Sequence, residues 1–295
     1  MNEAAPIAAA PGIDRTRRFI AEEFTPLFHT REYAALPDAA RLRYNQLHAL
    51  YFNEQVAFFE QEMLSPTLLA LVKIAPSTMA DGLRIFHDEE QRHTAMFRAL
   101  NRRSAPEFYA DGADYFIRVA KPWRALLGAM AHRPRLFPLL MWLALMQEER
   151  SLFYSKRCLE KADELELHFV ALHRTHLADE VGHVGWDGEV LDWLWPRTGG
   201  ALRSVNARLF AWMLGEFFHL PKRSGRRVIA QLAREFPRLN STALFRAMQD
   251  LAHDANFQLT LYSRSITPRT FARFDAHPEF ASLARTLPGY RPSPA

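Results

Sequence analysis

The stretch HLADEVGH, residues 176–183, places His176, Glu180 and His183 within eight positions of a run that is otherwise typical of an apolar helix. At about 100° per residue, Glu180 lies about 40° from His176 around the helix, and His183 lies about 20° to its other side. Three side chains that can bind a metal therefore share one face of the predicted helix.

The rest of the chain is also predicted to be helical, because Ala, Leu, Arg, Glu and Gln are abundant and strand-like alternation is rare. Ser65-Pro66 is expected to open a short helix of its own, since proline suits a first helical position. We expect longer helices at 14–29, 38–63, 77–103, 122–132, 136–161, 164–194, 202–218, 224–235 and 241–263.

Part of the first pattern occurs a second time. Glu89-Glu90-Gln91-Arg92-His93 and Asp179-Glu180-Val181-Gly182-His183 share the order acidic-Glu-x-x-His. Residues three apart are neighbours on a helix surface. Two predicted helices thus each offer a Glu-x-x-His pair, and the second adds His176.

Two more glutamates interrupt apolar helix faces. Glu54 has apolar residues at spacings of three, four and seven, and so has Glu149. Glu60 and Glu62 are less well enclosed, because Glu62 lies beside the predicted break at Ser65-Pro66, and Glu148 lies at the edge of its apolar stripe. We therefore expect Glu54 and Glu149 to face the core.

Buried carboxylates are costly unless a positive charge compensates them. One Glu from each of two helices, with a Glu-x-x-His from each of two others, is the pattern of di-iron and di-manganese bundles. A single Glu-x-x-His usually marks a solvated face, but two copies, a third histidine and two enclosed glutamates favour a metal site. Carboxylates with imidazoles suit iron, with manganese possible. The predicted ligands are Glu54, Glu90, His93, Glu149, His176, Glu180 and His183.

The predicted fold is an all-α, ferritin-like helix bundle, with four metal-bearing core helices and additional N- and C-terminal helices. Metal-bound imidazoles usually donate their second N–H to a carboxylate. We expect Asp179 to contact His93 in this way and Glu89 to contact His183. Residues 1–13 are expected to be disordered, 14–265 to form a single domain, and 266–295 to be a largely irregular tail.

Composition narrows the cellular setting. Cys158 is the only cysteine, which excludes an internal disulfide and a cysteine-based zinc site and suits a reducing cytoplasm. No signal peptide or membrane span is predicted. The net charge is +4, but residues 197–295 hold 15 basic and 6 acidic residues. The basic run KRSGRR at 222–227 has no nucleic-acid motif around it, so neither nucleic acid nor a membrane is expected as a partner.

Over residues 40–260 the chain resembles the p-aminobenzoate N-oxygenase family of ferritin-like di-iron oxygenases. The matching residues are Glu54, Glu90-Gln91-Arg92-His93, Glu149 and His176-Leu177-Ala178-Asp179-Glu180-Val181-Gly182-His183. The third histidine is the specific part, because most ferritin-like di-iron proteins carry two.

The resemblance implies two iron ions, an external electron donor, O2 and a small-molecule amine as substrate. It implies oxidation of an arylamine to a hydroxylamine, nitroso or nitro compound by a cytoplasmic homodimer in secondary metabolism. Glu90 and Glu180 would bridge the irons. Glu54 with His93 would bind one iron, and Glu149 with His176 and His183 the other.

Other functions remain open from the residues alone. A di-iron centre can also hydroxylate carbon or desaturate, and the family does not fix the substrate. Iron storage is a non-enzymatic alternative, but storage bundles are shorter chains assembled in cages. A radical-generating subunit of nucleotide reduction shares the fold, and the third histidine argues against it.

Overall fold

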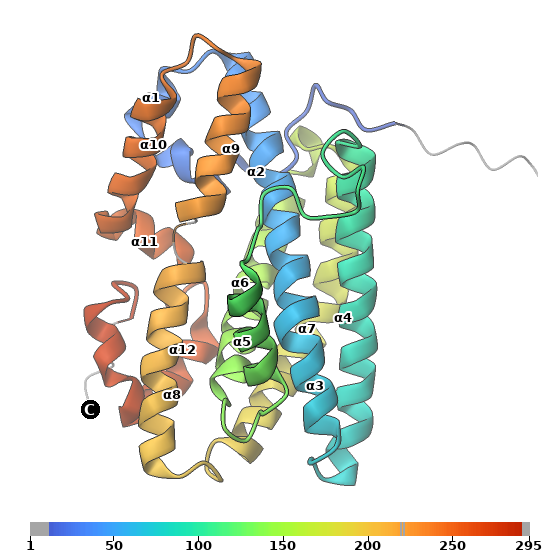
Figure 1. Ribbon diagram of the computed structural model, residues 1–295, viewed down its shortest axis with the longest axis vertical. Coiled ribbons are helices and arrows are strands. Elements are labelled where there is room, and N and C mark those ends of the chain that lie inside the picture. Colours follow the sequence, from blue (N-terminus) through green and yellow to red (C-terminus); the bar gives the residue numbers. More distant parts are fainter. Residues whose placement is uncertain (1–11, 219, 221, 291–295) are drawn as a thin grey trace, which may run out of the picture.

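The computed structural model describes residues 12–218, 220 and 222–290, and in these residues it contains helices and no strand. Four long helices lie side by side: α2 (Asp38–Phe59), α4 (Ser77–Ser104), α6 (Leu139–Glu160) and α7 (Leu167–Leu194) (Figure 1). The prediction of an all-α, ferritin-like bundle is confirmed.

Burial explains why these four segments form the core. In α6, every residue from Leu139 to Met146 is buried, so the helix is enclosed on all sides. α4 instead alternates buried and exposed faces, with Leu83, Phe86 and Phe97 fully inside. A helix that is apolar all round belongs to the centre of a large core, and an amphipathic one to its edge.

α4 and α7 run antiparallel and approach each other closely at Gly82. A Cβ atom added to Gly82 would lie 2.1 Å from the ring of Trp186 on α7. Further along the pair, the rings of His93 and His176 have their centroids 4.6 Å apart. The two helices that carry the Glu-x-x-His pairs therefore pack directly against each other.

α2 does not end where the sequence suggests. A π-helical turn, Glu60–Leu64, joins it to α3 (Ser65–Val72), and the backbone stays helical at both Leu64 and Ser65. Pro66 cannot donate a backbone hydrogen bond and crowds the carbonyl four residues earlier. A π turn can accommodate this within a continuing helix, and it rotates the faces that follow.

The remaining helices surround one side of this core. Figure 1 shows α8–α12, in orange and red, alongside the bundle; α9 packs on α2, and α8 and α12 pack on α6. They are α1 (Arg31–Ala34), α5 (Lys121–Ala131), α8 (Gly200–Met213) with a π turn Leu214–Phe218, α9 (Lys222–Glu235), α10 (Ser241–Asp250), α11 (Ala255–Leu261) and α12 (Pro268–Asp275). Short 3-10 helices span Glu22–Phe24, Pro26–His29, Ala162–Glu164, Leu251–His253 and Pro278–Arg285.

The prediction of a helix at 14–29 is wrong. The segment follows an irregular path that ends in the two 3-10 helices before α1. The side chain of Asn45 accepts from the N–H of Phe19 at 2.9 Å and donates to the carbonyl of Ile20 at 2.9 Å. These bonds replace the ones that a helix would make there. Of the stretch 1–13 predicted to be disordered, residues 1–11 lie outside the described residues.

Two expectations for the C-terminal part also differ from the structure. The helix predicted at 241–263 is divided, because Asp254 caps α11 by accepting from the N–H groups of Asn256 and Phe257. The tail predicted to be irregular contains α12 and the 3-10 helix Pro278–Arg285. Its Phe274 and Phe280 pack against Trp142 in the core, with ring centroids 5.5 and 4.5 Å away.

Within the described ranges, no helix combines the length and the apolarity that a bilayer span requires.

A buried histidine in α2 gives a testable dependence of stability on pH. Burial, together with the positive charge of Arg150, lowers the pKa of His48 from 6.5 to about 3. The folded state keeps His48 neutral while the unfolded state takes up a proton below pH 6.5. Stability is therefore lost as pH falls through this window, by up to about 1.4 kcal/mol per pH unit for one proton.

We expect His48→Gln to flatten this dependence. Urea unfolding at pH 7 and pH 5 should show a smaller loss of unfolding free energy in the variant than in the wild type. Equal losses in the two proteins would contradict the assignment of the proton to His48.

Candidate metal centre

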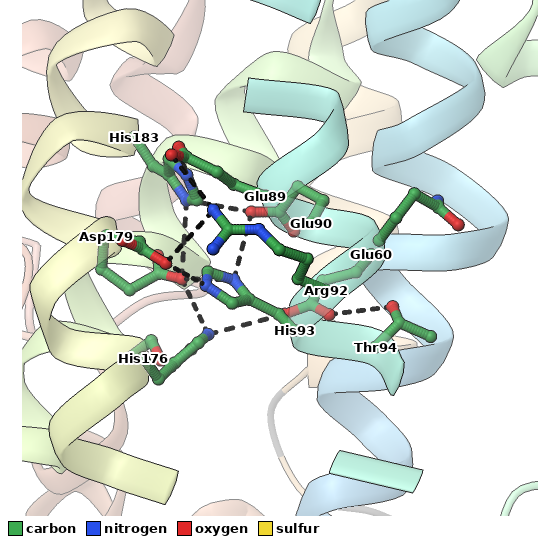
Figure 2. Close-up of polar contacts among 12 residues, drawn as sticks. Glu60, Glu89, Glu90, Arg92, His93, Thr94, His176, Asp179 and His183 are labelled. Carbon is green, nitrogen blue, oxygen red and sulfur yellow. Dashed lines mark hydrogen bonds and ion pairs between the residues drawn. The ribbon is translucent and has the colours of Figure 1, made fainter. Parts of the chain in front are cut away.

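Three helices bring six acids and imidazoles to one point in the bundle. These residues come from α4, α7 and the π turn after α2, and Figure 2 labels all of them except Glu180. None of the six is more than 3% exposed. We call them the cluster: Glu60, Glu90, His93, His176, Glu180 and His183.

The inner atoms of the cluster lie within contact distance of one another. His176 Nε2 is 2.7 Å from Glu180 Oε1 and 3.5 Å from Glu60 Oε1. His183 Nδ1 is 2.9 Å from Glu90 Oε1. Two overlapping sets have ligand atoms within 4.8 Å of one another, which suits adjacent cations. The sets are Glu90, His93, Glu180 and His183, and Glu60, His93 and His176.

Each imidazole is held from outside by its second nitrogen. His93 Nε2 lies 3.0 Å from Asp179 Oδ2, and His183 Nε2 lies 3.0 Å from Glu89 Oε2. These are the two contacts that the sequence predicts. His176 Nδ1 lies 3.2 Å from the hydroxyl of Ser151 on α6. The outer bonds orient all three rings so that the remaining nitrogen points into the cluster.

An exposed arginine links the two outer carboxylates. The guanidinium of Arg92 lies 3.3 Å from Glu89 Oε1 and 3.8 Å from Asp179 Oδ2. Glu89 on α4 contacts His183 on α7, and Asp179 on α7 contacts His93 on α4, so each carboxylate reaches across to the other helix (Figure 2). Arg92 therefore stabilises a crossed pair of contacts between α4 and α7.

The inner side of the cluster is short of hydrogen bonds. Seven buried atoms make no hydrogen bond of acceptable geometry, although several lie within ion-pair distance of one another. They are both carboxylate oxygens of Glu90 and of Glu180, His93 Nδ1, His176 Nε2 and His183 Nδ1. Buried polar atoms are normally satisfied, so such a group needs a specific explanation. Cations bound among these atoms would satisfy all seven, and the residues present therefore fit a metal site.

The pKa shifts inside the cluster have opposite directions. Burial and the charges of Glu90 and Glu180 raise the pKa of Glu60 well above its usual value. Burial and the neighbouring imidazoles lower the pKa of His176 well below its usual value. Burial alone would lower the pKa of His183, but its contacts with Glu180 and Glu90 raise it to about 11. Several acids and bases thus compete for protons in a volume without solvent.

Glu54, which the sequence places among the ligands, lies outside the cluster. Its carboxylate accepts from the Tyr109 hydroxyl at 2.7 Å. It also accepts from the backbone N–H groups of Tyr115, Phe116 and Ile117 at 2.7–3.1 Å. Burial raises the pKa of Glu54 to about 7, although these donors act in the opposite sense. Glu54 anchors the connection between α4 and α5.

Glu149 is likewise used elsewhere. Its two carboxylate oxygens accept from the N–H groups of Arg269 and Thr270, each at 2.8 Å, and from the Thr270 hydroxyl. A carboxylate at a helix N-terminus satisfies free N–H groups and interacts favourably with the helix dipole. Glu149 therefore caps α12 across the bundle, and the prediction that it joins the cluster is not met.

The neighbouring glutamate, Glu148, faces the cluster side of α6. With Glu60, Ser151 and His176 it lines a cavity of about 40 Å³, which we call the inner chamber. Glu148 is 5% exposed, and within the described part of the chain it has no hydrogen bond or ion pair. From the sequence, Glu60 is expected to be less well enclosed and Glu148 to lie at an edge, whereas both side chains line the inner chamber.

A further acid lies one turn beyond His183. Asp187 is fully buried, and neither of its oxygens has a hydrogen-bond partner. Burial raises its pKa well above the usual value. A neutral carboxylic acid can be buried without a cation, so Asp187 does not by itself extend the cluster.

The architecture and the site agree with a comparison against known families. The model of one family, described as p-aminobenzoate N-oxygenase AurF, matches residues 5–252. The chain belongs to this family. Members are oxygenases with a di-iron centre, which accords with the buried group of glutamates and histidines. No match was found among curated proteins.

In metal-free protein, substitution of Glu54, which anchors a connection, and of Glu60, which belongs to the cluster, should change the unfolding free energy differently. Glu54→Ala leaves three backbone N–H groups and a hydroxyl without their acceptor. At about 1–3 kcal/mol for each buried group left unpaired, and allowing for partial rehydration, we expect a loss of about 3 kcal/mol. Glu60→Gln removes a like charge from the cluster and should leave the unfolding free energy unchanged or higher.

Urea unfolding in the presence of a chelator measures both effects. A larger loss in Glu60→Gln than in Glu54→Ala would show that the structural roles are reversed.

Proposed function

We propose that this protein is a di-iron oxygenase that uses O2 to oxygenate the nitrogen of a small organic amine. The observation that carries the proposal is the cluster itself, with seven inner atoms that make no hydrogen bond of acceptable geometry and three inward-facing imidazoles. Membership of the family supports an oxygenase with a di-iron centre.

We assign seven ligands to the two irons. α2 with its π turn and α6 each supply one glutamate, and α4 and α7 each supply a Glu-x-x-His, which is the pattern of carboxylate-bridged bundles. Glu60 and Glu148 take the places that the sequence predicts for Glu54 and Glu149. The proposed ligands are Glu60, Glu90, His93, Glu148, His176, Glu180 and His183.

Charge and donor type both support this set. Four carboxylates carry a charge of −4, which two divalent cations balance. Carboxylate oxygens with neutral imidazoles suit iron, and manganese would also fit, whereas a structural zinc site favours thiolates. The only cysteine, Cys158, is fully buried and is not part of the cluster.

Bound iron would supply the redox chemistry that activates O2 once an external donor has reduced it. The residues of the chain hold the reaction in place. Asp179, Glu89 and Ser151 fix the orientation of the three imidazoles. Phe52, Val56, Phe59 and Phe218 form the apolar side of the inner chamber and exclude water from it.

The cysteine content and the family also suggest a cellular compartment and an oligomeric state for the enzyme. We propose a cytoplasmic enzyme of secondary metabolism, because a single buried cysteine suits a reducing compartment and the family acts on small amines. We propose a homodimer on the same family grounds. Gel filtration separates a dimer from the large cage of an iron-storage protein.

A product analysis tests the function directly. Protein reconstituted with ferrous iron is supplied with a chemical reductant, 18O2 and aniline, and the products are analysed by mass spectrometry. The proposal expects 18O on nitrogen, as hydroxylamine, nitroso or nitro product. Exclusive 18O on carbon would replace N-oxygenation by C-hydroxylation, and iron uptake without any organic product would favour storage.

Paired variants test the ligand assignment. Glu60→Gln and Glu148→Gln should lower the iron bound per chain, whereas Glu54→Gln and Glu149→Gln should leave it unchanged. Outer contacts alone are worth about 10–100-fold in metal affinity, so loss of a direct ligand should cost more than about 100-fold. Iron content after gel filtration and circular dichroism give the two readouts. Normal iron content in Glu60→Gln would remove that residue from the site.

His176→Ala tests the third imidazole. We expect the helical fold to survive while turnover falls by more than about 100-fold, with partial loss of iron. Wild-type iron content together with wild-type turnover would contradict the role of His176.

A further inference from the structure

A second cavity adjoins the inner chamber. It measures about 190 Å³ and lies between α2 with its π turn, the connection at 117–120, α5, and the end of α8 with the start of α9. We call it the outer cavity. Three residues line both spaces: Gln55, Phe59 and Phe218. The two cavities are therefore neighbours separated by a single layer of side chains.

The layer consists mainly of two aromatic rings. Phe59 and Phe218 meet edge to face, with ring centroids 5.6 Å apart and an interplanar angle of 88°. They are only 5% and 6% exposed. Gln55 completes the layer, and its Nε2 donates to the backbone carbonyl of Phe217 at 3.3 Å. We call these three residues the partition.

Both rings lie at π-helical turns. Phe59 immediately precedes the π turn Glu60–Leu64, and Phe218 is the last residue of the π turn Leu214–Phe218. Such turns are rare and occur frequently at functional sites. In the first of them, the same local geometry directs Phe59 to the partition and Glu60 to the cluster.

The backbone beneath the partition is held firmly. The Tyr262 hydroxyl donates to the Phe218 carbonyl at 3.2 Å, and Arg150 donates to that hydroxyl at 3.1 Å. Arg150 is fixed in turn by the Tyr154 hydroxyl at 2.8 Å. These bonds tie the Phe218 carbonyl to α6 through Tyr262 and Arg150.

The sizes of the two spaces assign different occupants to them. A cavity of about 150 Å³ can hold benzene, and a water molecule occupies roughly 30 Å³ in the liquid. The inner chamber, at about 40 Å³, can hold a water or a diatomic molecule but no ring. The outer cavity, at about 190 Å³, can hold one six-membered ring with small substituents.

The outer cavity has the surface that such a ring requires. Met63 and Leu127 contribute apolar walls, and Trp123 and Trp212 lie at its edge. The two indoles are 43% and 45% exposed, with centroids 6.0 Å apart. Large apolar side chains that are half exposed beside a cavity are typical of a ligand entrance.

We propose that the outer cavity binds the body of the amine substrate, and that Phe59 and Phe218 determine which amines react. The rings admit the reacting amino group to the inner chamber and retain the rest of the molecule outside. The substrate class is amines that carry about one six-membered ring. This inference rests on the proposed function.

The test compares a small and a large amine in wild-type and variant protein. The probes are aniline and 4-aminobiphenyl, and the variants are Phe218→Ala and the milder Phe59→Leu, each loaded with iron. A size limit in a hydrophobic pocket is worth about 10–200-fold, so Phe218→Ala should raise the ratio of kcat/KM between the large and the small amine by at least about tenfold. Phe59→Leu should change the ratio in the same direction.

Phe58→Ala is the matched control, because Phe58 lines the outer cavity and not the inner chamber. It should raise KM for both amines by a similar factor and leave the ratio of kcat/KM unchanged. An unchanged ratio in both Phe218→Ala and Phe59→Leu, with wild-type iron content and circular dichroism, would overturn the proposal.

A binding measurement separates this inference from the proposed function. Calorimetric titration of the iron-loaded protein with both amines under nitrogen needs no turnover. If no amine is oxygenated in air, N-oxygenation fails. The proposed role of the partition is supported if Phe218→Ala raises the affinity for 4-aminobiphenyl relative to aniline. That role is contradicted if the ratio of the two affinities is also unchanged.

Discussion

Burial of several carboxylates in one helical core is the constraint that organises this protein. A carboxylate without water must find donors, a cation or a proton. Glu54 and Glu149 find N–H and O–H donors, Asp187 has a pKa raised toward the neutral form, and Glu90 and Glu180 have only the imidazoles of the cluster beside them. The proposed metal centre follows from this last pair, because bound cations would compensate the charge of both carboxylates.

The same residue type therefore serves two purposes in neighbouring positions. Glu54 fastens the connection that lines the outer cavity, and Glu149 fastens α12 to α6. Glu60 and Glu148 lie six residues and one residue away from them, and both line the inner chamber. The anchoring glutamates hold the walls of the site in place, and the chamber glutamates face its interior.

The sequence predicts the helix-borne core of the site well, because helical spacing places His176, Glu180 and His183 on one face without knowledge of the tertiary structure. The crossed contacts of Asp179 and Glu89 are also anticipated, since each lies beside a cluster glutamate. Apolar surroundings identify a buried glutamate but not its partner. The donors of Glu54 and Glu149 come from distant segments, so spacing within one helix could not separate anchors from ligands.

The π turn also concerns Glu60, which the sequence indicates is less well enclosed and which the structure buries at the start of that turn. A uniform angle per residue fails at Glu60–Leu64, where the extra residue in the turn alters the register. Ser65-Pro66 is the only sign of this feature in the sequence, and it is read more naturally as a helix start. The irregular N-terminal segment and the helical tail are determined by tertiary contacts, such as those of Asn45 and Trp142, that local sequence does not reveal.

The contact between Gly82 and Trp186 has a consequence for the metal centre. The indole occupies the space that the smallest possible side chain, a methyl group, would need. The absence of that one carbon sets how near α4 and α7 can come, and hence the separation of Glu90 from His183. A residue outside the cluster thus acts as a spacer between the two helices that carry most of its side chains.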